Sequence, residues 1–215
     1  MATNGNNVYA INTYELTTAW TYSAPSAGSF LSSPCVENDS IIYIGNNNGN
    51  LYAIRTTTGT TKWSYQTGGE IVSSPVAVGG NVLIGSYDKI FYSIDSETGL
   101  KRWSFETKDR IHTSPIVFNQ YVYFGSYDMN FYCIDIIDGV ELWKIKTFGL
   151  IKSSPIVYNG SIYFSSFDKN LYKVDANTGG LYWNKNIEGQ IEASCIIDGI
   201  STVSYPANSG SYELK

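Results

Sequence analysis

The stretch WSFETKDRIHTSP, from Trp103 to Pro115, is followed at the same spacing by WKIKTFGLIKSSP, from Trp143 to Pro155. The tryptophans of the chain lie 43, 40, 40 and 40 residues apart, at Trp20, Trp63, Trp103, Trp143 and Trp183. A serine column keeps step with spacings of 41, 40, 40 and 40, at Ser33, Ser74, Ser114, Ser154 and Ser194. A fixed period of this length indicates a repeat architecture.

Each repeat contains four short runs of β-branched and aromatic residues, separated by turn residues. In one repeat the runs cover residues 71–78, 82–86, 91–95 and 101–106, which we name strands A to D. No window carries a sustained helical period. Four short strands in about 40 residues are typical of a β-propeller blade, because one small sheet buries its faces only when neighbours stack against it. We therefore predict an all-β fold, a β-propeller of four-stranded antiparallel blades.

The repeats predict a single β-propeller domain over residues 1–215. Full repeats cover about 31–71, 72–111, 112–151 and 152–191, with partial repeats at both ends. By register, Tyr9 and Tyr212 both fall in a strand C, so the chain offers two candidates for one position. Because an open sheet edge favours aggregation, we predict a closed ring of five blades, one of them a composite of residues 192–215 and 1–30. An arc of a larger propeller is the alternative.

Composition excludes several classes of protein. Of the 215 residues, 43% are hydrophobic and 15% are charged, against about 25% charged in an average domain. A net charge of −5 without a basic cluster argues against nucleic-acid binding. No apolar run reaches the ~18 residues of a transmembrane helix, and residues 1–7 lack the basic and apolar regions of a signal peptide. The sequence as written predicts a cytoplasmic chain and leaves the compartment otherwise open.

The repeat resembles the PQQ-like β-propeller family. The family motif Ala-x-Asp-x-x-Thr-Gly-x-x-x-Trp is matched by SIDSETGLKRW over residues 93–103 and more loosely over 173–183. The chain departs from it where Ser93, Cys133 and Lys173 replace the alanine and Leu16 replaces the glycine. The resemblance implies that the tryptophans dock between blades, and that the chain is similar to noncatalytic members such as the bacterial outer-membrane assembly lipoprotein, which are often exported.

The residues that carry chemistry in quinoprotein dehydrogenases of this family are not matched. Those enzymes hold quinone beneath two adjacent cysteines, whereas Cys35, Cys133 and Cys195 are far apart in this sequence. Asp88, Asp128 and Asp168 recur between strands B and C, and each stands alone, so we interpret them as turn residues rather than Ca²⁺ ligands. We predict no catalytic residue, no metal site and no cofactor.

A candidate binding site comes from strand A, whose equivalent positions form rings around the axis of a propeller. Most rings are uniform, but one reads Leu31, Val72, His112, Lys152 and Glu192, and Glu70 and Arg110 lie two residues before it. Solvated rim residues are the simpler interpretation. A histidine, lysine and glutamate converging at a channel mouth also suit a polar partner or acid–base chemistry.

Two functions remain open at the level of sequence. The first is a noncatalytic binding or scaffold propeller, acting as a monomer and mediating protein–protein interaction with a protein or peptide. The alternative is an enzyme, or a binder of small molecules or carbohydrate, that uses the channel mouth.

Overall fold

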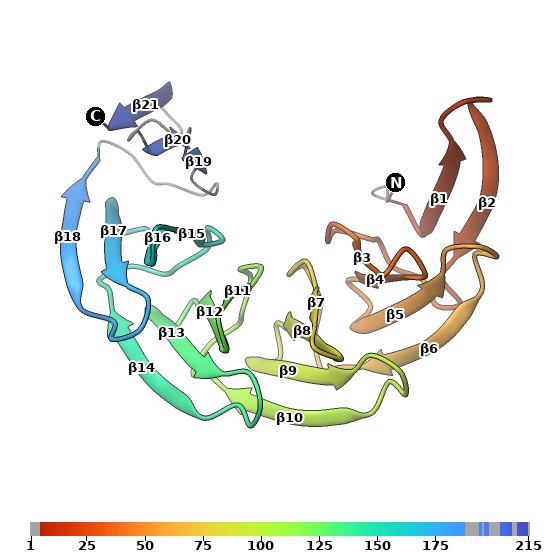
Figure 1. The fold of residues 1–215 in the computed structure, drawn as a ribbon, viewed down its shortest axis with the longest axis horizontal. Helices are drawn as coiled ribbons and strands as arrows, with labels where there is room; N and C mark the ends of the chain where they lie inside the picture. Colours follow the sequence, from red (N-terminus) through yellow and green to blue (C-terminus); the bar gives the residue numbers. More distant parts are fainter. Residues whose placement is uncertain (1–4, 188–193, 195, 198–202, 208–209, 215) are drawn as a thin grey trace. The chain divides into compact units, whose positions relative to one another are not determined.

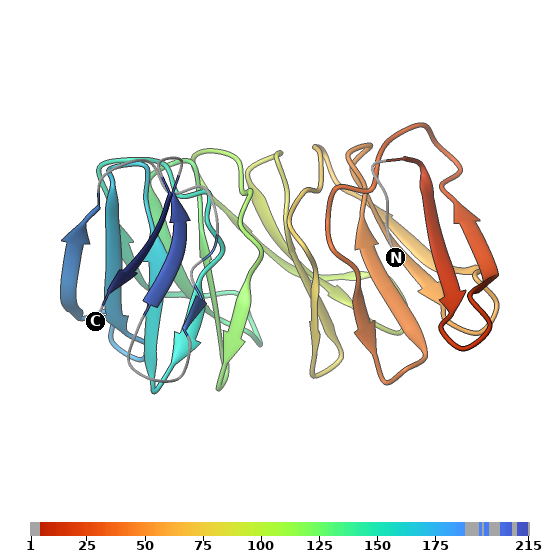
Figure 2. The ribbon, with the colours of Figure 1, turned by 90° about the horizontal axis from the view of Figure 1, so that it is seen from above.

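The computed structural model describes residues 5–187, 194, 196–197, 203–207 and 210–214, and all structural statements below concern this part of the chain. It contains 21 β-strands and no helix (Figure 1), which confirms the predicted all-β fold. The chain divides into two compact units, residues 1–106 and 107–215, which are described one at a time. Neighbouring strands of each sheet are antiparallel, and all strands of a sheet extend between the same two ends of that sheet (Figure 2).

The first unit contains a two-stranded sheet and two four-stranded antiparallel sheets. The two-stranded sheet pairs β1 (Asn7–Asn12) with β2 (Thr17–Ser23). The next is formed by β3 (Cys35–Glu37), β4 (Ile41–Gly45), β5 (Asn50–Arg55) and β6 (Thr61–Gln66). The third is formed by β7 (Val76–Val78), β8 (Asn81–Gly85), β9 (Ile90–Asp95) and β10 (Lys101–Glu106).

The second unit contains two four-stranded sheets and a three-stranded one. The first is formed by β11 (Ile116–Phe118), β12 (Tyr121–Gly125), β13 (Asn130–Asp135) and β14 (Glu141–Lys146). The second is formed by β15 (Ile156–Tyr158), β16 (Ser161–Ser165), β17 (Asn170–Asp175) and β18 (Leu181–Asn186). The third is formed by β19 (Ile196–Ile197), β20 (Val203–Ala207) and β21 (Gly210–Leu214).

Strand A is shorter than predicted. In the repeat analysed above, the strand starts at Val76 instead of residue 71, whereas strand D has the predicted bounds. The backbone of Ile71 instead pairs with the neighbouring sheet, since its N–H donates to the Asn46 carbonyl at 3.2 Å. Pro75 has no N–H to offer a ladder. The segment before strand A therefore connects two sheets rather than extending one.

The two strand C candidates at the chain ends have different partners. In the described residues, β21 pairs with β20, and β1 pairs with β2. Strand β21, the C-terminal candidate for strand C, thus pairs with β20. Whether the two terminal sheets share one blade, and whether the blades close a ring or form an arc, stays a prediction.

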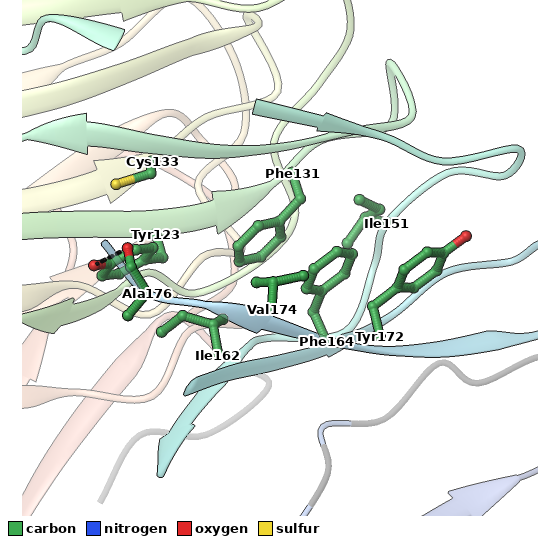
Figure 3. Close-up of a cluster of buried hydrophobic side chains, with 9 residues drawn as sticks. All are labelled: Tyr123, Phe131, Cys133, Ile151, Ile162, Phe164, Tyr172, Val174 and Ala176. Carbon is green, nitrogen blue, oxygen red and sulfur yellow. Dashed lines mark hydrogen bonds between the residues drawn. The ribbon is translucent and has the colours of Figure 1, made fainter. Parts of the chain in front are cut away.

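Apolar side chains bury the faces between neighbouring sheets. In the second unit, the Phe131 ring of β13 stacks on Phe164 of β16 with centroids 3.9 Å apart, and Phe164 stacks on Tyr172 at 5.0 Å (Figure 3). The Tyr123 hydroxyl crosses the same interface and donates to the Ala176 carbonyl at 3.0 Å. Strands B and C are buried on both faces, which explains why they are continuous apolar runs.

Candidate functional site

The variable ring position lies in the segment before strand A, between two buried residues. Ile111 and Thr113 are fully buried on either side of half-buried His112, and Ile151 and Ser153 flank half-buried Lys152 in the same way. The Thr113 hydroxyl donates to the Gly125 carbonyl at 2.8 Å, so the flanking residues are fixed to strand B. Only the middle residue faces outward, and it can therefore vary without disturbing the core.

The serine ring has a structural role. The Ser33 N–H donates to the Ser74 hydroxyl at 2.9 Å in the first unit. In the second unit the Ser114 N–H donates to Ser154 at 2.9 Å, and the Ser154 N–H donates to Ser194 at 3.2 Å. Each hydroxyl satisfies a backbone group of the preceding repeat, which explains why this column does not vary.

Two of the candidate binding residues, His112 and Arg110, meet on one tyrosine. The His112 ring stacks on the Tyr127 ring with centroids 6.0 Å apart and planes 26° from parallel, and the Arg110 guanidinium lies 5.6 Å from the Tyr127 centroid. The Tyr127 N–H also donates to the Arg110 carbonyl at 3.0 Å, so the turn between β12 and β13 is fixed to the loop that carries Arg110. The cluster combines an aromatic face, a permanent cation and a titratable ring.

The other candidates lie elsewhere. Lys152 occupies the position of His112 in the following sheet. Glu70 is exposed in the first unit, where its carbonyl accepts from the Tyr87 N–H at 2.9 Å. Glu192 falls outside the described residues, as do Ile191 and Cys195.

The sequence analysis missed Tyr127. The sequence feature that could have pointed to Tyr127 is the aromatic residue that stands immediately before each recurring aspartate, at Tyr87, Tyr127 and Phe167.

Three tryptophans contact the turn between strands C and D of the following sheet. Their indole N–H groups donate to backbone carbonyls, Trp20 to Thr56 at 2.6 Å, Trp63 to Ser96 at 3.0 Å and Trp143 to Asn177 at 3.1 Å. The indoles lie on Gly59, Gly99 and Gly179, where an added Cβ would come within 2.8 Å of the ring. These glycines have positive φ, so both the turn and the close approach require them.

The recurring aspartates bind the chain itself. Asp168 Oδ2 accepts from the Phe148 N–H at 3.0 Å and from the Tyr172 hydroxyl at 2.6 Å, and Oδ1 accepts from the Asn170 N–H at 2.9 Å. Asp88 and Asp128 repeat the arrangement. Each carboxylate fixes the loop of the preceding repeat, which agrees with the predicted turn role.

Of the three cysteines, the structure describes Cys35 and Cys133. Cys133 is fully buried, and this burial raises the pKa of its thiol to about 12. Cys35 is half-buried in β3. Within the described ranges, no group of three or more His, Cys, Asp or Glu side chains is arranged to hold a metal ion.

Comparisons with known proteins identify the architecture. The family described as outer membrane protein assembly factor BamB matches residues 4–204. The crystal structure of BamB from Moraxella catarrhalis superposes with a TM-score of 0.87 at 18% identity, covering 99% of this chain and 68% of that one. The computationally designed Ika8 protein superposes with a TM-score of 0.86 at 14% identity, covering 99% and 65%.

At these identities the two solved structures establish the fold alone, a β-propeller. Among curated proteins, no sequence matches this chain. Across the described residues, no helix has the length and apolar character to cross a membrane.

Proposed function

The chain belongs to the family described as outer membrane protein assembly factor BamB, and from this premise we propose that it is a noncatalytic scaffold that binds a protein or peptide. Its binding site is the cluster of Arg110 and His112 on Tyr127, together with Lys152 and Glu192 at the equivalent positions of the next repeats. Arg110 is its rim residue in the second unit.

A single observation carries this proposal. Along the segment before strand A, the flanking columns are held by burial and hydrogen bonds, whereas the outward position changes from Val72 to His112 to Lys152. The fold accepts side chains of different size and charge at that position. A change from an apolar to a charged residue there is the expected mark of an asymmetric partner.

The chemistry of the cluster favours a polar partner. Arg110 and Tyr127 already form a cation–π pair, and arginine and tyrosine are enriched among the residues that dominate binding energy. An apolar partner would remove the charged groups of Arg110 and Lys152 from water, which is costly. The partner is therefore expected to carry charges complementary to these groups.

The tryptophans would supply the rigidity that a scaffold needs. We assign Trp20, Trp63, Trp103, Trp143 and Trp183 the role of holding consecutive blades together. The contacts of Trp20, Trp63 and Trp143 with the following turns support this role. A fixed frame lowers the entropic cost of presenting a binding surface.

The test is the triple variant His112→Ala, Lys152→Ala, Glu192→Ala. Because His112 and Lys152 face outward, the melting temperature of the triple variant should stay nearly unchanged, while capture of the partner in cross-linking pull-downs should be lost. The matched control is Lys101→Ala, Glu106→Ala, Lys185→Ala, which removes exposed charges on outer strands. An unfolded triple variant would show a structural network instead, and undiminished capture would place the site elsewhere.

A further inference from the structure

An exposed phenylalanine stands on a fixed backbone at one end of the second unit. The Phe148 side chain, in the loop after β14, is 91% exposed. Its backbone does not move freely, because the Phe148 N–H donates to Asp168 Oδ2 at 3.0 Å. The preceding Thr147 is also fixed, since its N–H and hydroxyl donate to the Met129 carbonyl at 2.8 and 3.0 Å. The ring is therefore presented to solvent by a rigid turn.

Exposed lysines lie on Phe148's own loop and on the loops tied to Asp128 and Asp168. The Lys146 Nζ donates to the Asp128 carbonyl at 2.7 Å, beside Met129, whose side chain is 40% exposed. The Lys108 N–H donates to Asp128 Oδ2 at 3.0 Å, and Lys169 directly follows Asp168. We name this surface the Phe148 patch, defined by Lys108, Met129, Lys146, Phe148 and Lys169.

The aspartates beside the patch face the chain rather than the solvent. Asp128 and Asp168 are half-buried, whereas Lys108, Lys146 and Lys169 are exposed. Each of the two carboxylates accepts from two backbone N–H groups and one tyrosine hydroxyl. Asp109, also half-buried, accepts from the Arg110 N–H. The lysine side chains are therefore more exposed than the aspartates on these loops.

Equivalent surfaces lack this combination. In the first unit the corresponding residues are Gln66, Gly68 and Lys89, with no large apolar side chain.

At the opposite end of the β11–β14 sheet, Ile137 is 73% exposed, but its neighbours are the acidic residues Asp135, Asp138 and Glu141. An exposed apolar residue with exposed lysines on its own and adjoining loops thus occurs at the Phe148 patch and not at these two comparable places.

We propose that the Phe148 patch rests on an anionic lipid surface, with the phenylalanine in the interface and the lysines on the headgroups. A protruding aromatic ring gains from entering the apolar boundary, and a negative surface attracts the ammonium groups. A protein partner of ordinary surface composition would instead be expected to provide a pocket for the ring. This inference goes beyond the proposed partner binding and does not depend on it.

The test measures co-sedimentation of the purified full chain, without any partner, with vesicles of equal parts phosphatidylcholine and phosphatidylglycerol. Binding should fall on vesicles of phosphatidylcholine alone and as salt is raised. Phe148→Ser should lower the partition coefficient about tenfold through lost apolar insertion. The double variant Lys146→Glu, Lys169→Glu should lower it by more than tenfold, about fivefold for each charge removed, and abolish the salt dependence.

The matched control is Ile137→Ser, which removes an exposed apolar side chain from the acidic end of the same sheet and should leave vesicle binding unchanged. Circular dichroism and melting temperature confirm that each variant is folded. The proposal is wrong if the native chain does not sediment with anionic vesicles, or if Phe148→Ser binds them as the native chain does. Either result would leave the partner site at His112 untouched.

Discussion

Two junctions between neighbouring sheets, one in each unit, share one contact and differ in another. The first joins β1–β2 to the β3–β6 sheet, and the second joins the β11–β14 and β15–β18 sheets. Both use a tryptophan on a glycine turn, Trp20 with Gly59 and Trp143 with Gly179. The indole hydrogen bonds are 2.6 Å and 3.1 Å long.

At the other end of the sheets the polar chemistry diverges. In the second junction, Asp168 makes charge-assisted bonds of 3.0 Å and 2.6 Å to Phe148 and Tyr172. In the first, the Asn48 amide makes bonds of 3.5 Å and 3.3 Å to Ser26 and Tyr52. The two junctions thus share the contact between tryptophan and glycine, whereas the polar contact uses a carboxylate in the second junction and a neutral amide in the first. Ionised acceptors form shorter and stronger bonds, so the second junction is the more tightly held at this end.

A related difference lies two residues earlier. Ser166 donates from its hydroxyl to the Gly149 carbonyl at 2.9 Å. The corresponding Asn46 accepts from the Asn48 N–H at 2.9 Å, but its fully buried Nδ2 has no partner among the described residues. An unsatisfied buried N–H destabilises the fold, so the first junction carries a defect that the second lacks.

The largest effect is expected when the contact between tryptophan and glycine, which both junctions share, is removed. Trp143→Ala and Trp20→Ala should each lower the free energy of unfolding by about 2–4 kcal/mol, because each leaves a cavity against a glycine turn. Denaturant melts measure the loss. A loss below about 1 kcal/mol at either site would show that the tryptophans do not hold the sheets together.

The next experiment compares the contributions of Asp168 and Asn48 to stability. Asp168→Ala should cost about 2–3 kcal/mol, since it leaves the buried Tyr172 hydroxyl and the Phe148 N–H without their acceptor. Asn48→Ala should cost less than about 1 kcal/mol, because the hydrogen bonds that its Nδ2 donates to Ser26 and Tyr52 are long and neutral. Equal losses in denaturant melts would remove the distinction between the two junctions.

Alkaline pH tests the second junction through Tyr172. Burial, and then the hydrogen bond to Asp168, raise the pKa of Tyr172 above its ordinary value of 10.0. Below that pH both the folded and unfolded chains keep the proton and the contribution to stability is complete. Above it the unfolded chain ionises first, so stability falls as pH rises.

In the variant Tyr172→Phe, the decrease in unfolding free energy between pH 9 and about 11 should be smaller by about 1 kcal/mol. Chemical melts across this range measure it. The assignment fails if the variant and the native chain lose stability in parallel.

The smallest expected effect repairs the first junction. Asn46→Ser places the residue of the other repeats in this turn and removes the unpaired amide, so it should raise the free energy of unfolding by about 0.5–1 kcal/mol. Ser166→Asn is the reciprocal control and should lower it. A destabilised Asn46→Ser variant would mean that the local backbone, and not the orphaned N–H, decides the choice of asparagine.

Much of the fold was predictable because its determinants recur in the sequence. The tryptophan and serine columns gave the repeat length, and short runs of β-branched and aromatic residues predicted strands B to D. Strand A was predicted too long, since Ile71 is apolar like a strand residue but its N–H pairs with Asn46 of another sheet. The hydrophobic pattern indicates that Ile71 is buried, but it does not indicate which segment of the chain accepts the hydrogen bond from its N–H.

The candidate site was predicted only in part. His112 was identified as a break in a repeating column and Arg110 as a charged residue two positions before it, whereas Tyr127 was not identified, because aromatic residues recur at its position. The contact among the three depends on a turn and a loop that are 15 or more residues apart in the chain. No rule based on residue spacing predicts that this turn and this loop lie against each other.

The sequence by itself determined the repeat, the all-β fold and the residues that depart from the repeating pattern, because each of these depends on local preference and on period. Only the tertiary structure decided that Asp168 fixes Phe148, that Tyr127 joins His112 to Arg110, and that the buried Asn46 Nδ2 finds no partner within the described part of the chain. These contacts arise where sheets meet, and their geometry follows from how whole sheets pack rather than from the order of residues within one.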